Sequence, residues 1–232
     1  MTREKLLRAA FDEIYRRGFQ AASLETILAQ AGVTKGALYH HFPDKAALGY
    51  AVVDDLVRGL LLERWLGVLE RQRGDPLTAL QKMLQERTGQ LTPQEVELGC
   101  PLHNLAQEVS PLDESFRRRI DATFDTWRSG IAEALRRGQA EGSVRRDVDA
   151  DRIAAFMVAA IEGSFGLAKS AKSSVMLRSN LQILSTFLEG LRPARNRRGR
   201  GKMAAPALAP AGADPDKHDP GQHRRPRQQS SQ

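Results

Sequence analysis

The chain has 232 residues, of which 41% are hydrophobic and 27% are charged, and its formal net charge is +7. This length and composition are typical of a globular protein with two compact units and a sizeable buried core. They argue against a membrane protein, because the longest wholly apolar run, residues 153–161, has nine residues and a spanning helix needs about twenty.

The first predicted helix begins close to the N-terminus. Leu7, Ala10, Phe11 and Ile14 fall on one helical face, and Gly18 marks the end of the helix. Because charge and helical periodicity begin at once, the start of the chain does not resemble a signal peptide. We therefore expect a cytoplasmic protein.

Residues 23–42 indicate two short helices joined by a glycine turn. Ser23 is a natural N-cap for the first helix, in which apolar residues recur at helical spacing up to Ala31. Gly32 can adopt the positive φ that ends this helix, and Thr34 can cap the second one.

The second of these helices has one apolar face and one small, polar face. Leu38 and Phe42 point one way, whereas Gly36, Tyr39 and His40 point the other way. A helix that reads a DNA groove needs small residues for close approach and a few hydrogen-bonding side chains. Gly36 weakens the helix by about 1 kcal/mol, which close approach to DNA explains better than packing does.

A further helix is predicted directly after this pair. Pro43 ends the DNA-reading helix, and Asp44 is a natural N-cap for the next one. Lys45 lies in its first turn, beside backbone N–H groups that favour anions, so we expect it to contact a DNA phosphate.

Residues 1 to about 50 resemble the DNA-binding domain of the TetR/AcrR family of bacterial transcriptional regulators. The motif is a hydroxyl residue, then Lys-Gly-x-x-Tyr-x-His-Phe, then x-x-Lys-x-x-Leu, and it is formed by Thr34, Lys35, Gly36, Tyr39, His41, Phe42, Lys45 and Leu48. The resemblance implies that Tyr39 and Lys45 contact phosphates of double-stranded DNA and that Phe42 belongs to the core. It also implies that Thr34, Lys35 and His40 lie at or near the groove. The alternative is a helical hairpin whose polar residues are merely exposed.

Helical spacing continues through the rest of the chain, and no β-type alternation of any length occurs. We therefore predict an all-α protein with a three-helix helix-turn-helix domain at residues 1–50 and a helical effector-binding and dimerisation domain at residues 51–192. A long helix is expected over residues 45–73, followed by one that begins at Asp75-Pro76 and ends near Gly89. Residues 90–101, rich in Pro and Gly, indicate a broken stretch before a short helix over residues 102–109.

Three helices are predicted in the C-terminal half, over residues 116–138, 150–168 and 174–191. In the second, Ala159 and Gly163 are small residues that permit close helix approach. The third carries a coiled-coil-like repeat formed by Leu177, Leu181, Leu184, Leu188 and Leu191.

This pair of helices has more apolar surface than one subunit can easily bury. We predict a homodimer through a four-helix bundle, which the family resemblance also implies, and the dimer would place two recognition helices on a pseudo-palindromic operator. The alternative is that these helices complete the core of their own subunit.

The resemblance further implies an effector, of unknown identity, that acts through the helical domain. One hypothesis is an apolar pocket for a small organic molecule, lined by Trp65, Met83, Phe124, Trp127 and Phe165, although aromatic residues at such spacing are more often plain core.

The second hypothesis is sensing by Cys100, in a Gly99-Cys-Pro-Leu-His-Asn-Leu motif that resembles one branch of the family in which this thiol responds to electrophiles or oxidants. A helix start would lower the pKa of the thiol, and His103 is close in sequence. The alternative for Cys100 is inert buried packing.

The remaining composition is consistent with a regulator rather than an enzyme. The single cysteine excludes an intramolecular disulfide, and the five histidines show no metal-ligand spacing, so we expect no cofactor and no structural metal. A helical enzyme or ligand carrier without sequence-specific DNA binding is the alternative from another class, but no phosphate loop or nucleophile–base set supports it.

The C-terminal segment, residues 193–232, is expected to form a disordered basic tail. It holds nine Lys or Arg against three Asp or Glu, and it is rich in Pro, Gly and Gln. Such an arm could add salt-sensitive attraction to DNA, although a solubilising tail with no further role is the simpler interpretation.

Overall fold

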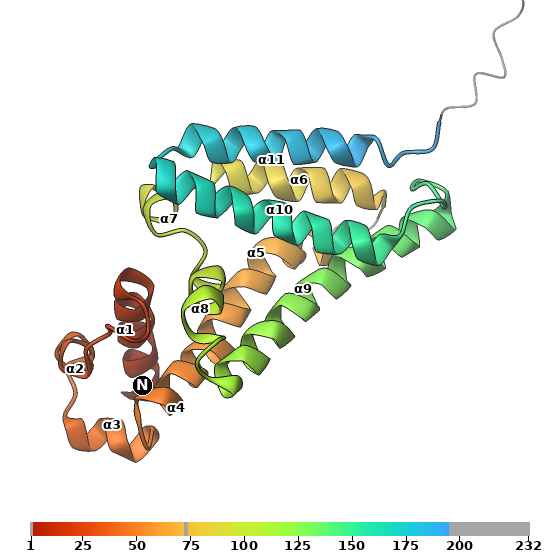
Figure 1. The fold of residues 1–232 in the computed structure, drawn as a ribbon. Coiled ribbons are helices and arrows are strands. Elements are labelled where there is room, and N and C mark those ends of the chain that lie inside the picture. The colour runs from red at the N-terminus through yellow and green to blue at the C-terminus, as the bar shows by residue number, and fades with distance from the viewer. Residues whose placement is uncertain (1, 72–73, 195–232) are drawn as a thin grey trace, which may run out of the picture. The chain divides into compact units, whose positions relative to one another are not determined.

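Residues 2–71 and 74–194 are described by a computed structural model, and all regular structure within these ranges is helical (Figure 1). This confirms the predicted all-α class, while the tail from residue 195 onward lies outside the described residues. In chain order the helices are α1 (Thr2–Arg17), α2 (Leu24–Ala31), α3 (Lys35–His41), α4 (Lys45–Ala51), the π-helical η1 (Val52–Val57), α5 (Arg58–Arg71), α6 (Pro76–Gly89), α7 (Pro93–Leu98), α8 (Pro101–Val109), α9 (Glu114–Glu141), α10 (Ala150–Ala171) and α11 (Ser174–Glu189).

Helices α1 to α3 form the N-terminal head, and their ends are set by the predicted caps. The Ser23 hydroxyl accepts a hydrogen bond from the Thr26 N–H at 3.3 Å, which starts α2. Gly32 ends α2 with a φ of 63°, in the left-handed region that favours glycine. The Thr34 hydroxyl then accepts from the Ala37 N–H at 3.2 Å and starts α3.

The long helix predicted over residues 45–73 is present from Lys45 to Arg71, and residues 72 and 73 lie outside the described residues. It contains an unpredicted π-helical segment, η1, between α4 and α5. Two adjacent carboxylates project from η1 in different directions. Asp55 pairs with Arg3 of α1 at 2.6 Å, and Asp54 pairs with Arg119 of α9 at 2.9 Å. The segment thus binds the head on one side and the body on the other, and π-helical turns often lie at functional positions.

The body consists of the remaining helices. Helix α9 runs from the neighbourhood of α4 and α8 to the far end of the body, where α6, α10 and α11 lie side by side (Figure 1). Residues 90–101, predicted as a broken stretch, contain a helix of their own, α7. Its start is fixed by a reciprocal capping box between Thr92 and Glu95, an arrangement that favours a helix even over six residues.

The leucine repeat of α11 lies inside the subunit. Leu177, Leu181, Leu184 and Leu188 are buried against the rest of the same chain, at exposures of 0–5%. The expectation that these leucines form a dimer interface is therefore corrected, because α11 packs its leucine face on α6 and α10 of its own subunit.

The outer faces of α10 and α11 carry the unburied apolar surface. Ala159 and Gly163 are exposed, as is Ile183 at 66%. The Phe156 ring of α10 meets the Phe187 ring of α11 with centroids 5.2 Å apart, so exposed apolar side chains of the two helices are in contact. The exposed apolar residues of α10 and α11 are called the outer strip. The strip also includes Leu167, Val175 and Met176.

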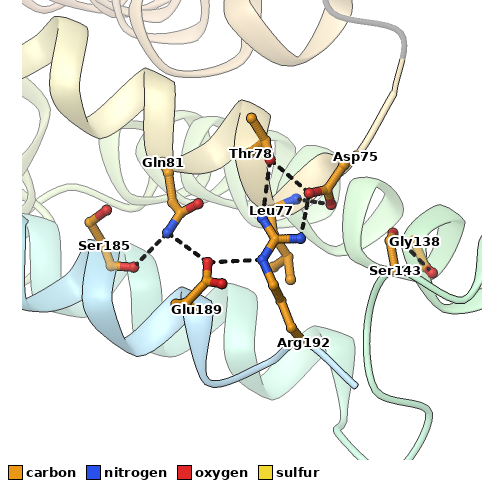
Figure 2. A network of polar contacts seen from close by, with 9 residues as sticks. All are labelled: Asp75, Leu77, Thr78, Gln81, Gly138, Ser143, Ser185, Glu189 and Arg192. Atoms are coloured by element: carbon orange, nitrogen blue, oxygen red, sulfur yellow. Dashed lines mark hydrogen bonds and ion pairs between the residues drawn. The ribbon is translucent and has the colours of Figure 1, made fainter. Parts of the chain in front are cut away.

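A network of polar contacts fixes the C-terminal end of α11 to the start of α6 (Figure 2). Arg192 donates to the Asp75 carboxylate and, at 3.1 Å, to the Thr78 hydroxyl. Glu189 accepts from Arg192 at 2.8 Å and from the Gln81 amide at 3.3 Å. This network holds α11, and with it the outer strip, in a defined position on the body.

Helix α10 is the one described helix whose length and composition would allow it to cross a membrane, with a mean hydropathy of 1.3. Much of that apolar character belongs to residues that face the core of the subunit, such as Met157, Ile161 and Phe165. Most of the rest lies on the outer strip, so the packing of α10 accounts for its composition.

Candidate functional site

The face of α3 that was predicted to read DNA is exposed along its whole length. Thr34, Lys35, Gly36 and His40 are exposed, and the Tyr39 side chain is 46% exposed. The opposite face of the helix is buried, with Leu38 at 0% and Phe42 at 4% exposure. The core therefore holds the helix by one side and presents the other side to solvent.

The cations around this face are partly engaged with neighbouring groups. The Lys35 ammonium lies 5.9 Å from the centroid of the Tyr39 ring, which places a positive charge beside the face of this ring on the exposed side of α3. The Lys45 ammonium donates to the Gln20 carbonyl at 3.0 Å and lies 5.1 Å from the centroid of the Phe19 ring. Lys45 thus fixes the loop between α1 and α2, and it keeps further N–H donors for a phosphate.

The junction between α7 and α8 and helix α8 itself hold the C-terminal end of α1. At the junction, the Tyr15 hydroxyl donates to the carbonyl of Gly99, the C-cap of α7, at 2.5 Å. On α8, the Glu108 carboxylate accepts from the backbone N–H groups of Phe19 and Gln20, both at 2.8 Å. These contacts connect the head to the body.

A cavity of about 260 Å³ lies beside the first of these contacts. Of the residues predicted to bind or sense an effector, Trp65, Cys100 and Phe165 line it, together with Tyr15 of the head. The Trp65 and Phe165 rings meet edge to face, with centroids 6.5 Å apart. The cavity volume is close to the lower end of the range of about 300–1,000 Å³ for small-molecule sites.

Four charged residues line this cavity. Asp12 of α1 is exposed, whereas Arg64 of α5, Arg87 of α6 and Glu95 of α7 are joined in one group that forms its polar wall. Both guanidinium groups donate to the same carboxylate oxygen, Glu95 Oε1, at 2.6 Å each. Arg87 is 4% exposed, and burial lowers its pKa from the ordinary value, although an arginine stays protonated in proteins.

The environment of Cys100 contradicts the expected reactive thiolate. The side chain is buried, at 6% exposure, and burial raises the pKa of the thiol well above its usual value. The nearby Glu162 carboxyl raises it further, whereas the backbone at the start of α8 acts weakly in the opposite direction. The dominant influence is desolvation and not the helix start, so Cys100 stays a protonated thiol at neutral pH.

His103 and Glu162 lie behind Cys100, outside the group that lines the cavity. The His103 Nδ1 atom is 4.0 Å from Glu162 Oε2, and burial lowers the pKa of His103. Glu162 is 4% exposed, and its two oxygens have no hydrogen-bond partner within the described part of the chain. Burial raises the pKa of Glu162 to about 7.

The other predicted effector residues belong to the core. Met83 and Trp127 are fully buried, and Trp127 stacks on Trp65 with ring centroids 5.0 Å apart. Phe124 is half-buried and packs against the core. None of these three lines the cavity.

Sequence reasoning missed the charged residues of this region, although a signal for them exists. Arg87 continues the buried stripe of α6 after Leu77, Leu80 and Leu84, at helical spacing. Glu162 occupies a comparable place on α10, between Val158 and Phe165. A charged residue on an apolar stripe is buried with a partner or serves a site, so the stripe itself could have identified both.

Two family models match the chain, and they divide it between head and body. The model described as bacterial regulatory proteins of the tetR family matches residues 6–52. The model described as the C-terminal domain of LmrA/YxaF-like transcriptional regulators matches residues 76–181.

Individual relatives and solved structures agree with these matches. An uncharacterized HTH-type transcriptional regulator of Lactococcus lactis is 32% identical over 189 residues, which cover 81% of this chain and 93% of the relative. The repressor DhaR of Mycobacterium sp. is 28% identical, covering 83% and 93%. A TetR transcriptional regulator from Chloroflexus aurantiacus superposes with a TM-score of 0.72 at 27% identity, covering 82% of this chain and 96% of that one. Together with the exposed recognition helix, these similarities show that the chain belongs to the TetR family of DNA-binding bacterial transcriptional regulators.

Proposed function

We propose that the protein is a homodimeric repressor that binds a pseudo-palindromic operator and leaves it when a small-molecule effector occupies the helical body. The observation that carries this proposal is α3, a helix buried on one side and exposed on the other, with the side chains of Lys35, Tyr39 and His40 on its free face. Repression is supported by two relatives described as transcriptional repressors, DhaR of Mycobacterium sp. and NemR of Escherichia coli.

The dimer is proposed to form through the outer strip of α10 and α11. Exposed apolar patches of this kind mark interaction sites in soluble proteins, and a two-fold contact between identical strips is self-complementary. Ala159 and Gly163 would let two copies of α10 approach closely, while Phe156 and Ile183 would supply apolar area. The leucines that were first expected at this interface lie on the opposite, buried face of α11, where they pack against their own subunit.

The effector is proposed to bind in the cavity lined by Trp65, Cys100 and Phe165. This cavity borders the Tyr15–Gly99 contact between head and body, so its occupation can move α1. Because Cys100 is buried and protonated, we assign it to the cavity wall and not to a redox switch. A cytoplasmic location fits a protein that binds chromosomal DNA, and no membrane role is proposed.

A mobility-shift assay with DNA from upstream of the protein's own gene tests this function. We expect a sequence-selective shift, with Tyr39→Ala weakening binding to all sequences and His40→Ala changing the base preference. Arg128→Ala, a change on the surface of α9, is the matched control and should bind as the unmodified protein does. An enzyme or carrier would show no sequence-selective shift, which would refute the proposal.

A further inference from the structure

We propose that the cavity beside Tyr15 accepts a small organic anion whose carboxylate binds Arg87 and Arg64 and whose apolar part packs against Trp65 and Phe165. This inference rests on the proposed effector function and gives the chemical class of the effector. It begins from the distribution of charge on the polar wall.

Each oxygen of Glu95 already accepts two hydrogen bonds, so Glu95 can accept no further one from either arginine. Its Oε1 atom accepts from both guanidinium groups at 2.6 Å. Its Oε2 atom accepts from the Thr92 N–H at 3.0 Å and from the Thr92 hydroxyl at 3.1 Å, because it completes the capping box of α7. One buried carboxylate therefore faces two guanidinium groups, so the group formed by Arg64, Arg87 and Glu95 carries one positive charge in excess. The second carboxylate that lines the cavity, Asp12, is exposed to solvent.

The positive charge of Arg87 is the less well compensated of the two, because Arg87 is the more deeply buried arginine and water cannot solvate it. Its side chain is 5% exposed, compared with 44% for Arg64. Its Nε–H group is buried without a hydrogen-bond partner among the described residues. An unpaired buried donor of this kind costs about 1–3 kcal/mol, and a charged one costs more. A ligand carboxylate can accept two parallel hydrogen bonds from a guanidinium group, which a neutral ligand cannot do as strongly.

The rest of the cavity selects for an apolar body on that anion. The Arg87 guanidinium lies 5.9 Å from the centroid of the Phe165 ring, so the ring and the charge share one side of the cavity. Trp65, Leu61 and Val57 supply further apolar surface. Tyr15 offers no free donor, since its hydroxyl already binds the Gly99 carbonyl.

A cationic ligand fits less well. Asp12, which also borders the cavity, is exposed, so water weakens its field. Glu162, a second buried carboxyl group of this region, does not line the cavity. Glu95 does line it, but its oxygens already accept from Arg64, Arg87 and Thr92, and the two guanidinium groups beside it repel a cation.

The test is calorimetric titration of the full-length protein, without DNA, with benzoate, phenylacetate and 3-phenylpropionate. The corresponding amides and benzylamine are the comparison ligands. We expect at least one carboxylate to bind at least tenfold more tightly than its amide, and benzylamine not to bind. Arg87→Met should weaken carboxylate binding at least tenfold, while Arg128→Met, at a half-exposed arginine on α9 that does not line the cavity, should leave it unchanged.

Arg64→Met is the second variant, because Arg87 is buried and its loss could unfold the protein. Arg64 is half-exposed, so this variant should fold and bind the carboxylate several-fold more weakly. Equal binding of acid and amide, preference for benzylamine, or no binding of any carboxylate at millimolar concentration would overturn the inference. Tight carboxylate binding that fails to release DNA in a separate assay would instead leave the site intact and refute the proposed regulation.

Discussion

Glu162 is a carboxyl group on the buried face of α10, and its environment makes the stability of the protein depend on pH. Its pKa rises from an ordinary 4.5 to about 7 because burial disfavours the charged form. Between about pH 4.5 and pH 7, the folded state therefore keeps a proton on Glu162 that the unfolded chain has already released. Stability from this group is fully present below pH 4.5 and is lost as the pH rises to about 7.

We predict that Glu162→Gln removes this loss, because an amide does not titrate. With a pKa of 4.5 in the unfolded chain and about 7 in the folded state, the linked loss between pH 5 and pH 8 is about 2.5 kcal/mol, so the variant should lose about that much less unfolding free energy over this range than the unmodified protein. Urea denaturation at the two pH values measures this difference. Glu133→Gln, at an exposed position of α9, should follow the unmodified protein, and the same behaviour in Glu162→Gln would disprove the assignment.

A substitution at Gly36 is expected to affect the stability of the fold and the binding of DNA in opposite directions. A Cβ atom at this position would meet only the Thr34 hydroxyl oxygen, at 3.9 Å, so alanine fits the free protein without strain. We predict that Gly36→Ala stabilises the fold by up to about 1 kcal/mol and weakens operator binding, because the added methyl group prevents close approach to the groove. Thermal melting and mobility shift read the two effects separately.

The matched control for Gly36 is Gly59→Ala in α5. Its Cβ atom would meet nothing within 4 Å, and it lies outside the recognition helix. It should stabilise the protein and leave DNA binding unchanged. If Gly36→Ala behaved in the same way, the glycine would have no role in approach to DNA.

Helix α4 is held to the body by a close approach at Gly49. A Cβ atom there would lie 2.5 Å from Cε2 of Phe19 and 2.7 Å from Cζ of Phe116, at the base of α9. We predict that Gly49→Ala costs about 1–3 kcal/mol of unfolding free energy, because two packed rings must move. Chemical denaturation measures the loss, and Gly89→Ala, where the space is open, should show none. If Gly49→Ala left the free energy of unfolding unchanged, the rings of Phe19 and Phe116 would be able to move aside at little cost.

Helix boundaries could be predicted from sequence where a local chemical signal marks them. Ser23, Gly32, Thr34 and Asp75 each fix an end through a cap or a left-handed turn, and each does so in the structure. The η1 segment was not predicted. Its Asp54 and Asp55 side chains pair with residues that are far away in sequence, and no local pattern shows such contacts. Helix α7 was missed because its proline and glycine lie at its two ends and not in its interior.

In the whole molecule, the position of the leucine repeat could not be predicted for the same reason, because it depends on contacts with distant parts of the chain. A period of three and four shows that one face of α11 is buried, but it does not say whether the partner is the same chain or a second copy. The answer came from α6, which covers that face and is about a hundred residues away in sequence. The DNA-reading face was easier to predict, since a short helix with a local motif sets it. The cavity required contacts between α1, α5, α6, α7 and α10, which no local pattern encodes.

The proposed dimer leads to a prediction for the outer strip. Ile183→Asp should convert the dimer to a monomer and abolish tight operator binding, because a charge would be buried between two apolar strips. Sedimentation velocity at micromolar concentration measures the change. Leu112→Asp is the control, since Leu112 is 68% exposed but lies in the turn before α9, and it should stay dimeric. A dimeric Ile183→Asp variant would place the interface elsewhere.

Hydroxyl-radical footprinting of the full-length protein on its own upstream DNA tests the central claim most directly. We expect two protected half-sites related by a two-fold axis and spaced by one helical turn or more, because two copies of α3 would lie in successive major grooves. In the Tyr39→Ala variant both half-sites should lose protection together. A single unpaired protected site, or uniform protection without sequence preference, would contradict the account.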